Sequence, residues 1–215
     1  IRKGLVYING NKVKSAGEKA DTLNDEVTYK ENIIKYIEFE YILLNKPAGV
    51  VSATEDRKEK TVLDIIDSKR KDLFPVGRLD KDTEGLLLLT NDGMLAHELL
   101  SPKKHVDKKY YVETDGLLTD EHRKLFKNGI KVDDEFTAKE AELQILSSGD
   151  KGSKAYLTIR EGKYHQVKRM MEAVGNTVTY LKRISMGPLT LPEDMETGTS
   201  RMLTDSEINM LKGGK

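Results

Sequence analysis

Four consecutive leucines, Leu86–Leu89, constrain the fold of this chain more than any other stretch. A polar loop precedes the run, and Asn91-Asp92-Gly93, a typical turn sequence, follows it closely. A run this short is unusual for a helix, whereas a strand with both faces buried is apolar at every position. We therefore expect a β-strand in the middle of a sheet, with hydrophobic core on either side of it.

The loop before this strand, Gly77–Gly85, places charged residues next to the expected core. Three carboxylates and two cations lie between its bounding glycines. A loop anchored to a buried strand keeps its side chains in fixed positions, and loops of this kind often carry function. Aspartates in a glycine-bounded loop also serve as turn and capping residues. The loop alone leaves a catalytic role and a structural role for Asp80 both open.

The charge balance gives no overall indication of a nucleic-acid partner, because 36 Lys and Arg residues oppose 36 Asp and Glu residues. The charges are nevertheless clustered: six cations lie between Lys151 and Arg169, against one acid, Glu161. A basic face is therefore compatible with the neutral total. The chain has no cysteine, which excludes disulfides, thiolate metal sites and cysteine nucleophiles.

No apolar stretch has the length of a membrane span, and no secretory signal precedes the first strand. We therefore expect a cytoplasmic protein that has no membrane partner. The sequence begins with Ile1 rather than Met, which leaves room for a preceding segment.

Hydrophobic periodicity and turn residues predict an α+β fold, with a mixed, largely antiparallel sheet and flanking helices. A smaller N-terminal unit, residues 1–37, precedes a main domain at 38–215. Besides the leucine strand, we expect a hairpin at 4–13 and strands at 38–45, 108–114, 140–146, 154–160 and 177–185. We expect helices at 61–69, 94–100, 119–127 and 204–212, and a further one that starts near His165 and ends at Gly175.

Two kinds of metal site can be considered, and the first would use the carboxylates of Asp80, Asp82, Glu84 and Asp92. The spacing of Asp80, Asp82 and Glu84 resembles the start of a calcium loop, but the twelfth position of that loop is Asn91 instead of a glutamate. The histidines are scattered, without the spacing of zinc ligands. We expect no metal.

A different arrangement, with Asp80 buried in a basic cleft beside an aromatic side chain, gives a role to more of these residues than a metal site does. A nearby cation, Lys168 or Lys163, would keep the Asp80 carboxylate ionised, and an ionised carboxylate can act as nucleophile or base. Tyr110 could stack on a flat substrate, and Arg78 could fill the space left by a base that leaves its stack. For His165, an RNA contact and a structural hydrogen bond remain equally open.

Three motifs in order resemble the RsuA-type rRNA pseudouridine synthases (the RsuA/Rlu family). They are Gly77–Asp80 continuing through Thr83–Gly93, then Lys108–Val112, then Glu161–Met170. The resemblance spans nearly the whole chain. It implies the pseudouridine synthase fold and the isomerisation of one uridine, which the enzyme flips out of its RNA.

The resemblance also implies roles for individual residues. Asp80 corresponds to the catalytic aspartate, Tyr110 to the tyrosine that stacks on the uracil, and Lys168, or less favourably Lys163, to the basic partner of the aspartate. Val167 corresponds to the aliphatic residue against the base, and Arg78 to the arginine beside the flipped nucleotide. The family uses no metal and no organic cofactor. Further RNA contacts are expected from Lys163, His165, Gln166, Arg169, Lys3 and Lys12.

The N-terminal unit is similar to the C-terminal half of the alpha-L RNA-binding module and lacks that module's two leading helices. The expected partner is rRNA, either naked or in an assembling small subunit, and the expected state is a monomer. The form of the Glu161–Met170 motif favours 16S (small-subunit) rRNA as substrate. The alternatives are a 23S (large-subunit) enzyme, a non-catalytic rRNA-binding or ribosome assembly factor, and a metal-dependent phosphohydrolase.

Overall fold

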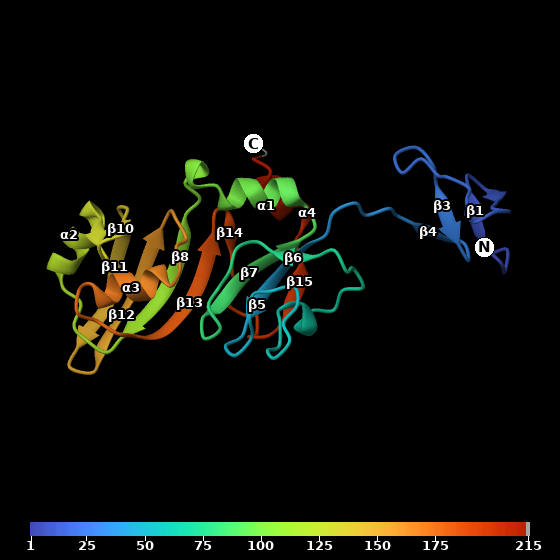
Figure 1. Ribbon diagram of the computed structural model, residues 1–215. Helices are drawn as coiled ribbons and strands as arrows, with labels where there is room; N and C mark the ends of the chain where they lie inside the picture. Colours follow the sequence, from blue (N-terminus) through green and yellow to red (C-terminus); the bar gives the residue numbers. More distant parts are fainter. Residues whose placement is uncertain (214–215) are drawn as a thin grey trace. The chain divides into compact units, whose positions relative to one another are not determined.

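The structure is a computed structural model that describes residues 1–213, and the chain divides into two compact units (Figure 1). The smaller unit comprises Ile1–Phe39 and the larger one begins at Glu40. The smaller unit is a four-stranded antiparallel sheet in the order β2-β1-β3-β4. Its strands are β1 (Val6–Ile8), β2 (Asn11–Lys12), β3 (Val27–Tyr29) and β4 (Asn32–Ile34).

The hairpin predicted at 4–13 is confirmed, because β1 pairs with β2 around Asn9-Gly10. Both turn residues have positive φ angles, 47° and 76°, as a tight two-residue hairpin turn requires. Among the described apolar residues of this unit, Val13 is the buried one. The unit therefore has very little hydrophobic core of its own.

The larger unit is built on a nine-stranded mixed sheet with the order β11-β12-β8-β13-β7-β5-β15, where β14 also pairs with β13 and β6 with β7. Its strand pairs are antiparallel except β7 with β13, so the predicted fold class is confirmed. The strands are β5 (Tyr41–Lys46), β6 (Phe74–Pro75), β7 (Glu84–Thr90), β8 (Lys108–Thr114), β11 (Glu142–Gly149), β12 (Gly152–Ile159), β13 (Val178–Met186), β14 (Leu189–Thr190) and β15 (Ser200–Met202).

The leucine run forms the middle of β7, as predicted, and is buried on both faces. Leu87 and Leu89 point into one hydrophobic cluster, and Leu86 and Leu88 point into the other. Helices α2 (Asp120–Asn128) and α3 (Gln166–Glu172) contribute to the first cluster. Helices α1 (Gly93–Leu100) and α4 (Asp205–Leu211) contribute to the second.

Short elements complete the larger unit. They are the 3-10 turns η1 (Leu63–Ile65) and η2 (Pro102–Lys104) and a separate two-stranded sheet of β9 (Ile130–Lys131) and β10 (Thr137–Ala138). No helix among residues 1–213 combines the length and the apolarity that crossing a membrane requires.

The helix expected at 61–69 is wrong. Only the single turn η1 forms, and the backbone is extended again at Ile66. The Asp64 carboxylate accepts hydrogen bonds from both the backbone N–H and the hydroxyl of Thr61, at 2.7 and 2.9 Å. These are the bonds of a helix start, but the helix does not continue: beyond Ile66 the Ser68 hydroxyl accepts from the Arg70 N–H at 3.2 Å, and such a local side-chain bond competes with helical backbone bonding. The apolar spacing of this segment therefore serves a loop packed on the core.

Candidate active site

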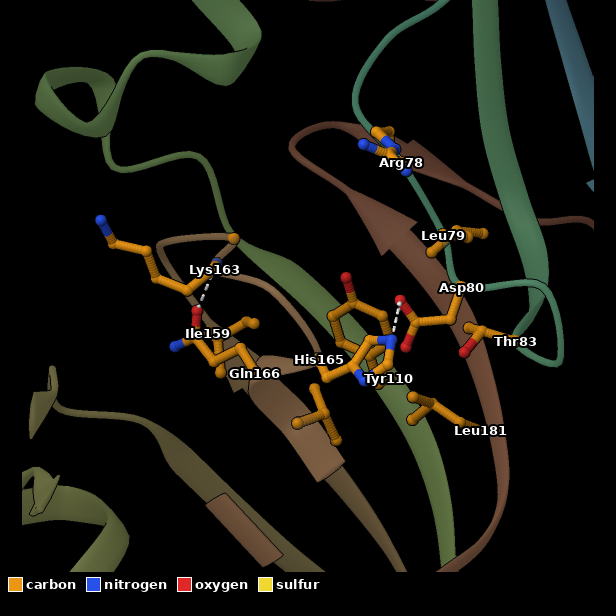
Figure 2. Close-up of a pocket in the computed structure, with 12 residues that line it drawn as sticks. Arg78, Leu79, Asp80, Thr83, Tyr110, Ile159, Lys163, His165, Gln166 and Leu181 are labelled. Carbon is orange, nitrogen blue, oxygen red and sulfur yellow. Dashed lines mark hydrogen bonds and ion pairs between the residues drawn. The ribbon is translucent and has the colours of Figure 1, made fainter. Parts of the chain in front are cut away.

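A small cavity of about 60 Å³ lies between the loop that precedes β7 and the start of α3 (Figure 2). Asp80, Tyr110 and Val167 line it, together with Arg78, Lys163 and His165. The cavity adjoins a wider cleft of about 840 Å³, which shares Asp80 and several other lining residues with it. The structure thus brings together residues from all three motifs, and the outermost of these residues, Arg78 and Val167, lie 89 positions apart in the sequence.

The loop that carries Asp80 is held by the last residue of β5 and by the segment that follows this strand. The Lys46 ammonium is fully buried and donates hydrogen bonds to the carbonyls of Asp80, Lys81 and Thr83, at 3.0, 3.2 and 2.8 Å. The hydroxyl of Ser52 both donates to the Leu79 carbonyl and accepts from the Leu79 N–H, at 2.9 and 3.0 Å. The backbone on either side of Asp80 is therefore fixed.

Burial is the dominant influence on Lys46. It lowers the pKa of the ammonium to about 8, although the charges of Asp82, Asp80 and Glu84 act in the opposite direction. The bound carbonyls, including that of Pro47 at 3.0 Å, compensate for the lost water. Lys46 is a structural cation beneath the loop and does not line the cavity.

The two oxygens of the Asp80 carboxylate each face a cationic or ionisable group. Nε2 of His165 lies 3.5 Å from Oδ1, and Nζ of Lys168 lies 3.4 Å from Oδ2. Figure 2 shows the His165 ring and the Asp80 carboxylate turned toward each other. The Asp80 side chain is 25% exposed, so it is accessible from the cavity and still largely shielded from water.

Lys168 also binds Asp82, through Nζ contacts of 2.6 and 2.8 Å to its two oxygens. Burial tends to lower the pKa of Lys168, but the hydrogen bond to Asp82 and the charges of Asp80 and Asp82 together raise it above its ordinary value. The same hydrogen bond lowers the pKa of Asp82. Lys168 is therefore a permanent cation beside Asp80.

Tyr110 forms a wall of the cavity and is 7% exposed. It points to the core side of β8, and its neighbour Tyr111 points to the other side and donates its hydroxyl to Glu113 at 2.6 Å. The two neighbouring tyrosines therefore lie on opposite faces of the sheet. Aliphatic side chains of Val167, Leu181 and Ile159 also line the cavity.

The turn before α3 positions His165 through an unusual backbone conformation. His165 has a φ angle of +48°, in the left-handed region, and its ring stacks on Tyr164 with 3.8 Å between centroids. Gln166 is buried and accepts a hydrogen bond from the Lys163 N–H while donating to Glu161, at 2.9 and 2.8 Å. The amide of Gln166 thus holds this turn together.

The other residues singled out from the sequence occupy different places. Arg78 and Lys163 line both the cavity and the wider cleft. Arg169 points away toward Asp133, with which it forms an ion pair, and toward the ring of Phe136. Lys3 and Lys12 belong to the smaller unit.

The acidic residues considered as metal ligands are used otherwise. Asp92 caps α1, where one oxygen accepts from the Leu95 N–H at 3.0 Å and the other from the Tyr41 hydroxyl at 2.7 Å. Within the described part of the chain, no three His, Asp or Glu side chains are grouped so that they could hold a metal ion.

Sequence reasoning missed Lys46, Ser52 and Leu181. Lys46 had a detectable signal, because a lysine at the end of an apolar strand and before a proline is unusual in a core. Ser52 and Leu181 had none, since a serine in a loop and a leucine in a strand are common everywhere. Their roles depend on which segments the fold brings together.

Known proteins resemble this chain in sequence and in fold. Residues 40–173 match the sequence profile of a family described as RNA pseudouridylate synthase. An uncharacterized RNA pseudouridine synthase of Bacillus subtilis is 46% identical, with 98% of this chain and 89% of the relative covered. The ribosomal large subunit pseudouridine synthase B of Bacillus subtilis is 39% identical, over 99% of this chain and 87% of the relative.

The ribosomal small subunit pseudouridine synthase A of Haemophilus influenzae is also 39% identical, over 98% of this chain and 90% of the relative. A crystal structure of a pseudouridylate synthase superposes with a TM-score of 0.75 and 38% identity, over 98% of this chain and 90% of the other.

Proposed function

Because this chain belongs to the RNA pseudouridylate synthase family and is thus an isomerase that acts on RNA, we propose that it converts one uridine of 16S (small-subunit) rRNA to pseudouridine, with Asp80 as the nucleophile. The observation that carries this proposal is the setting of the Asp80 carboxylate. It faces a cavity with an aromatic wall and lies between Lys168 and His165, at 3.4 and 3.5 Å.

The reaction requires that the uridine leave its stack, because C1′ and C6 are inaccessible inside folded RNA. Extrusion costs a few kcal/mol. Stacking of the uracil on Tyr110 returns about 1–3 kcal/mol, and Val167 packs against the base. Arg78, at the junction of cavity and cleft, occupies the space that the base leaves.

Asp80 then attacks the uridine and forms a bond with it, and the bond between N1 and C1′ breaks. The detached uracil turns and its C5 bonds to C1′ while the bond to Asp80 breaks; C5 loses its proton and N1 gains one, so the product is an isomer of the substrate. Lys168 remains a cation 3.4 Å from Oδ2 of this carboxylate, since its own pKa is raised. A narrow cavity excludes water, which would otherwise hydrolyse the intermediate.

The remaining candidate residues contact the RNA around the uridine that enters the cavity. The turn before α3 and the first part of this helix contact the RNA chain through Lys163, His165, Gln166 and Arg169. The N-terminal unit contacts it through Lys3 and Lys12. We assign residues 1–37 to a partial alpha-L RNA-binding module and 38–215 to the catalytic domain. The enzyme works as a cytoplasmic monomer, on naked 16S rRNA or on an assembling small subunit.

The form of the Glu161–Met170 motif supports 16S rRNA as the substrate. The second candidate is 23S (large-subunit) rRNA, because the small-subunit and large-subunit relatives are equally similar to this chain, at 39% identity.

The variant Asp80→Asn tests the catalytic assignment, because it keeps the shape of the side chain and removes its charge. We expect rRNA binding to persist and pseudouridine, detected by carbodiimide adducts and primer extension, to disappear. Asp67→Asn is the matched control, since Asp67 is an exposed aspartate outside the cavity, and it should retain full activity. Pseudouridine formation by Asp80→Asn at the normal rate would refute the role of Asp80.

The substrate is tested by mapping pseudouridines in both rRNAs from cells that lack the gene and from cells complemented with it. Loss of one site in 16S rRNA is expected. Loss of a site in 23S rRNA alone would transfer the assignment to the large subunit. If the wild-type protein bound rRNA without isomerising any uridine, the chain would be a binding factor.

A further inference from the structure

Lys108 is a buried cation at the edge of the wider cleft, and the reaction described above gives it no role. Its side chain is 7% exposed and lines the cleft together with Arg78 and Lys163. It lies two residues before Tyr110 on β8, and the alternation of burial along this strand places both residues on the same face. The two side chains thus start about 7 Å apart along the strand.

The Lys108 ammonium has few acceptors for its three N–H groups. Its one protein hydrogen-bond partner in the described part of the chain is the Val106 carbonyl, at 3.2 Å. Lys46, which is buried to a similar degree, donates to four carbonyls. Buried polar groups are normally satisfied, so an ammonium with a single acceptor has capacity for a further one.

The surroundings of Lys108 are positive. The guanidinium of Arg183, on the neighbouring strand β13, is 2% exposed; its Nε donates to the Leu86 carbonyl and its Nη2 has no partner. Burial and the charge of Arg183 both lower the pKa of Lys108, against the opposing charge of Asp107. Asp107 is itself bound to Arg160 at 2.8 Å.

The acids that line the cleft do not neutralise this spot. The carboxylate of Glu161 accepts hydrogen bonds from the Lys139 N–H and from Gln166, both at 2.8 Å. Asp80 faces His165 and Lys168. A chemical group that could reach Lys108 from the cleft and supply acceptors and negative charge is therefore missing from the protein itself.

We propose that Lys108 binds a backbone phosphate of the RNA chain next to the uridine that enters the cavity. This inference rests on the proposed function, because it makes the cleft the path of the substrate RNA. The phosphate supplies the missing acceptors. Its contact with Lys108 positions the sugar-phosphate chain while the base stacks on Tyr110, which lies two residues further along the same face of β8.

The variant Lys108→Met tests this proposal, because methionine keeps the aliphatic part of the side chain and removes the ammonium. The probe is a fluorescein-labelled oligouridylate of about 12 nucleotides, whose binding is followed by anisotropy at several KCl concentrations. We expect affinity to fall about tenfold, and the slope of log affinity against log salt to decrease by about 0.7, the value for one lost phosphate contact on a single strand.

Lys109→Met is the matched control. Lys109 is the next residue on the same strand, but its ammonium lies over the Tyr156 ring on the opposite face, 4.2 Å from the centroid. This variant should keep the wild-type slope. Lys108→Arg retains the charge and should also keep the slope, which provides a test even if the methionine variant folds poorly.

Turnover gives an independent reading. With in vitro transcribed 16S and 23S rRNA, Lys108→Met should raise KM about tenfold and leave kcat within about twofold. An unchanged salt slope in folded Lys108→Met, or a loss confined to kcat, would overturn the proposal. Oligouridylate binding is measured without catalysis, so the two proposals can fail separately. Failure of the wild-type protein to form pseudouridine would count against the proposed function. The phosphate contact would still be tested by the salt slope of Lys108→Met.

Discussion

A lysine with no exposed surface, Lys46, connects the strand β5 to the position of the nucleophile. Its ammonium is the common donor for carbonyls of Pro47, Asp80, Lys81 and Thr83. Removing a donor from buried carbonyls costs about 1–3 kcal/mol for each group that is left unsatisfied. The loop around Asp80 therefore depends on one side chain that the substrate does not touch.

We predict that Lys46→Met lowers the free energy of unfolding by about 2–4 kcal/mol, because only part of the lost bonding can be replaced by water. Urea denaturation measures this change. Turnover should fall as well, since Asp80 loses its fixed position. Lys81→Met is the control: Lys81 lies in the same loop, but its ion pair with Glu59 is exposed, and its removal should change stability by less than about 1 kcal/mol. Equal effects of the two substitutions would contradict the role given to Lys46.

At the scale of elements, an ion pair joins β15 to α4. The Arg201 guanidinium binds both oxygens of Glu207, at 2.7 and 2.8 Å. The Glu207 carboxylate also accepts from the Thr204 N–H at 2.8 Å, and the Thr204 hydroxyl in turn accepts from the Glu207 N–H at 3.2 Å. This reciprocal cap begins α4 and anchors it to the sheet.

The pair makes stability depend on pH in a defined direction. The hydrogen bond from Arg201 lowers the pKa of Glu207 to about 2, although burial acts in the opposite sense. A carboxyl group whose pKa is lower in the folded state stabilises the fold above its ordinary pKa and loses this contribution as pH falls toward the folded value. The stabilisation is therefore complete above pH 4.5 and is lost between pH 4.5 and 2.

We predict that Glu207→Gln lowers the free energy of unfolding at pH 7 by about 1–2 kcal/mol, because solvent screens the partly exposed Arg201. Glutamine still caps the helix, so the charge is the main difference. The gap between variant and wild type should shrink as pH falls below 4.5. Glu193→Gln, at an exposed glutamate, should show no gap at any pH. A constant gap down to pH 2 would contradict the assignment.

Most elements were predictable from the sequence because a local pattern determines them. The β7 leucines, the alternation of β8 and the threonine caps before α2 and α4 are examples. The segment 61–69 was not predictable, because its apolar spacing and the bonding of Asp64 to Thr61 both match a helix start, yet the backbone becomes extended at Ile66. Strand order was not predictable either: β7 meets β13 in parallel across more than 90 residues of chain.

For the site, sequence motifs identified residues that touch the cavity, such as Asp80, Tyr110 and Val167. They did not reveal which groups hold these residues. The backbone hydrogen bonds made by Lys46 and Ser52 depend on the packing of the 46–52 segment against the loop at 79–83. The motifs also did not show that Lys168 forms ion pairs with both Asp80 and Asp82, because these contacts depend on distances in the folded structure and not on spacing along the chain.

At the scale of the whole molecule, stability is divided unevenly between the two units. Both hydrophobic clusters consist of residues of the larger unit, whereas the smaller unit has Val13 as its buried apolar residue among those described. A unit of this size with so little buried apolar surface contributes little to global stability.

We predict that a chain beginning at Lys35, without the four strands of the smaller unit, unfolds cooperatively within about 4 °C of the full chain, as calorimetry would show. Its affinity for rRNA should be lower and less dependent on salt, since Lys3, Lys12 and other cations are removed. The double variant Lys3→Gln/Lys12→Gln of the full chain should show part of the same loss. Unchanged affinity in both proteins would remove the smaller unit from RNA recognition.

The parallel contact between β7 and β13 joins two halves of one sheet, with Asp80 preceding one strand and Tyr110 on the neighbour of the other. The register there, Lys182 with Glu84 and Arg183 with Gly85, brings the two backbones so close that a Cβ atom at Gly85 would lie 2.2 Å from the Arg183 carbonyl oxygen. The distance between the Asp80 carboxylate and the Tyr110 ring is therefore set by the backbone contact between β7 and β13. Substitutions along the contact between β7 and β13 would thus shift Asp80 relative to Tyr110, and change the reaction rate, even in an enzyme where every residue that touches the nucleotide is the same.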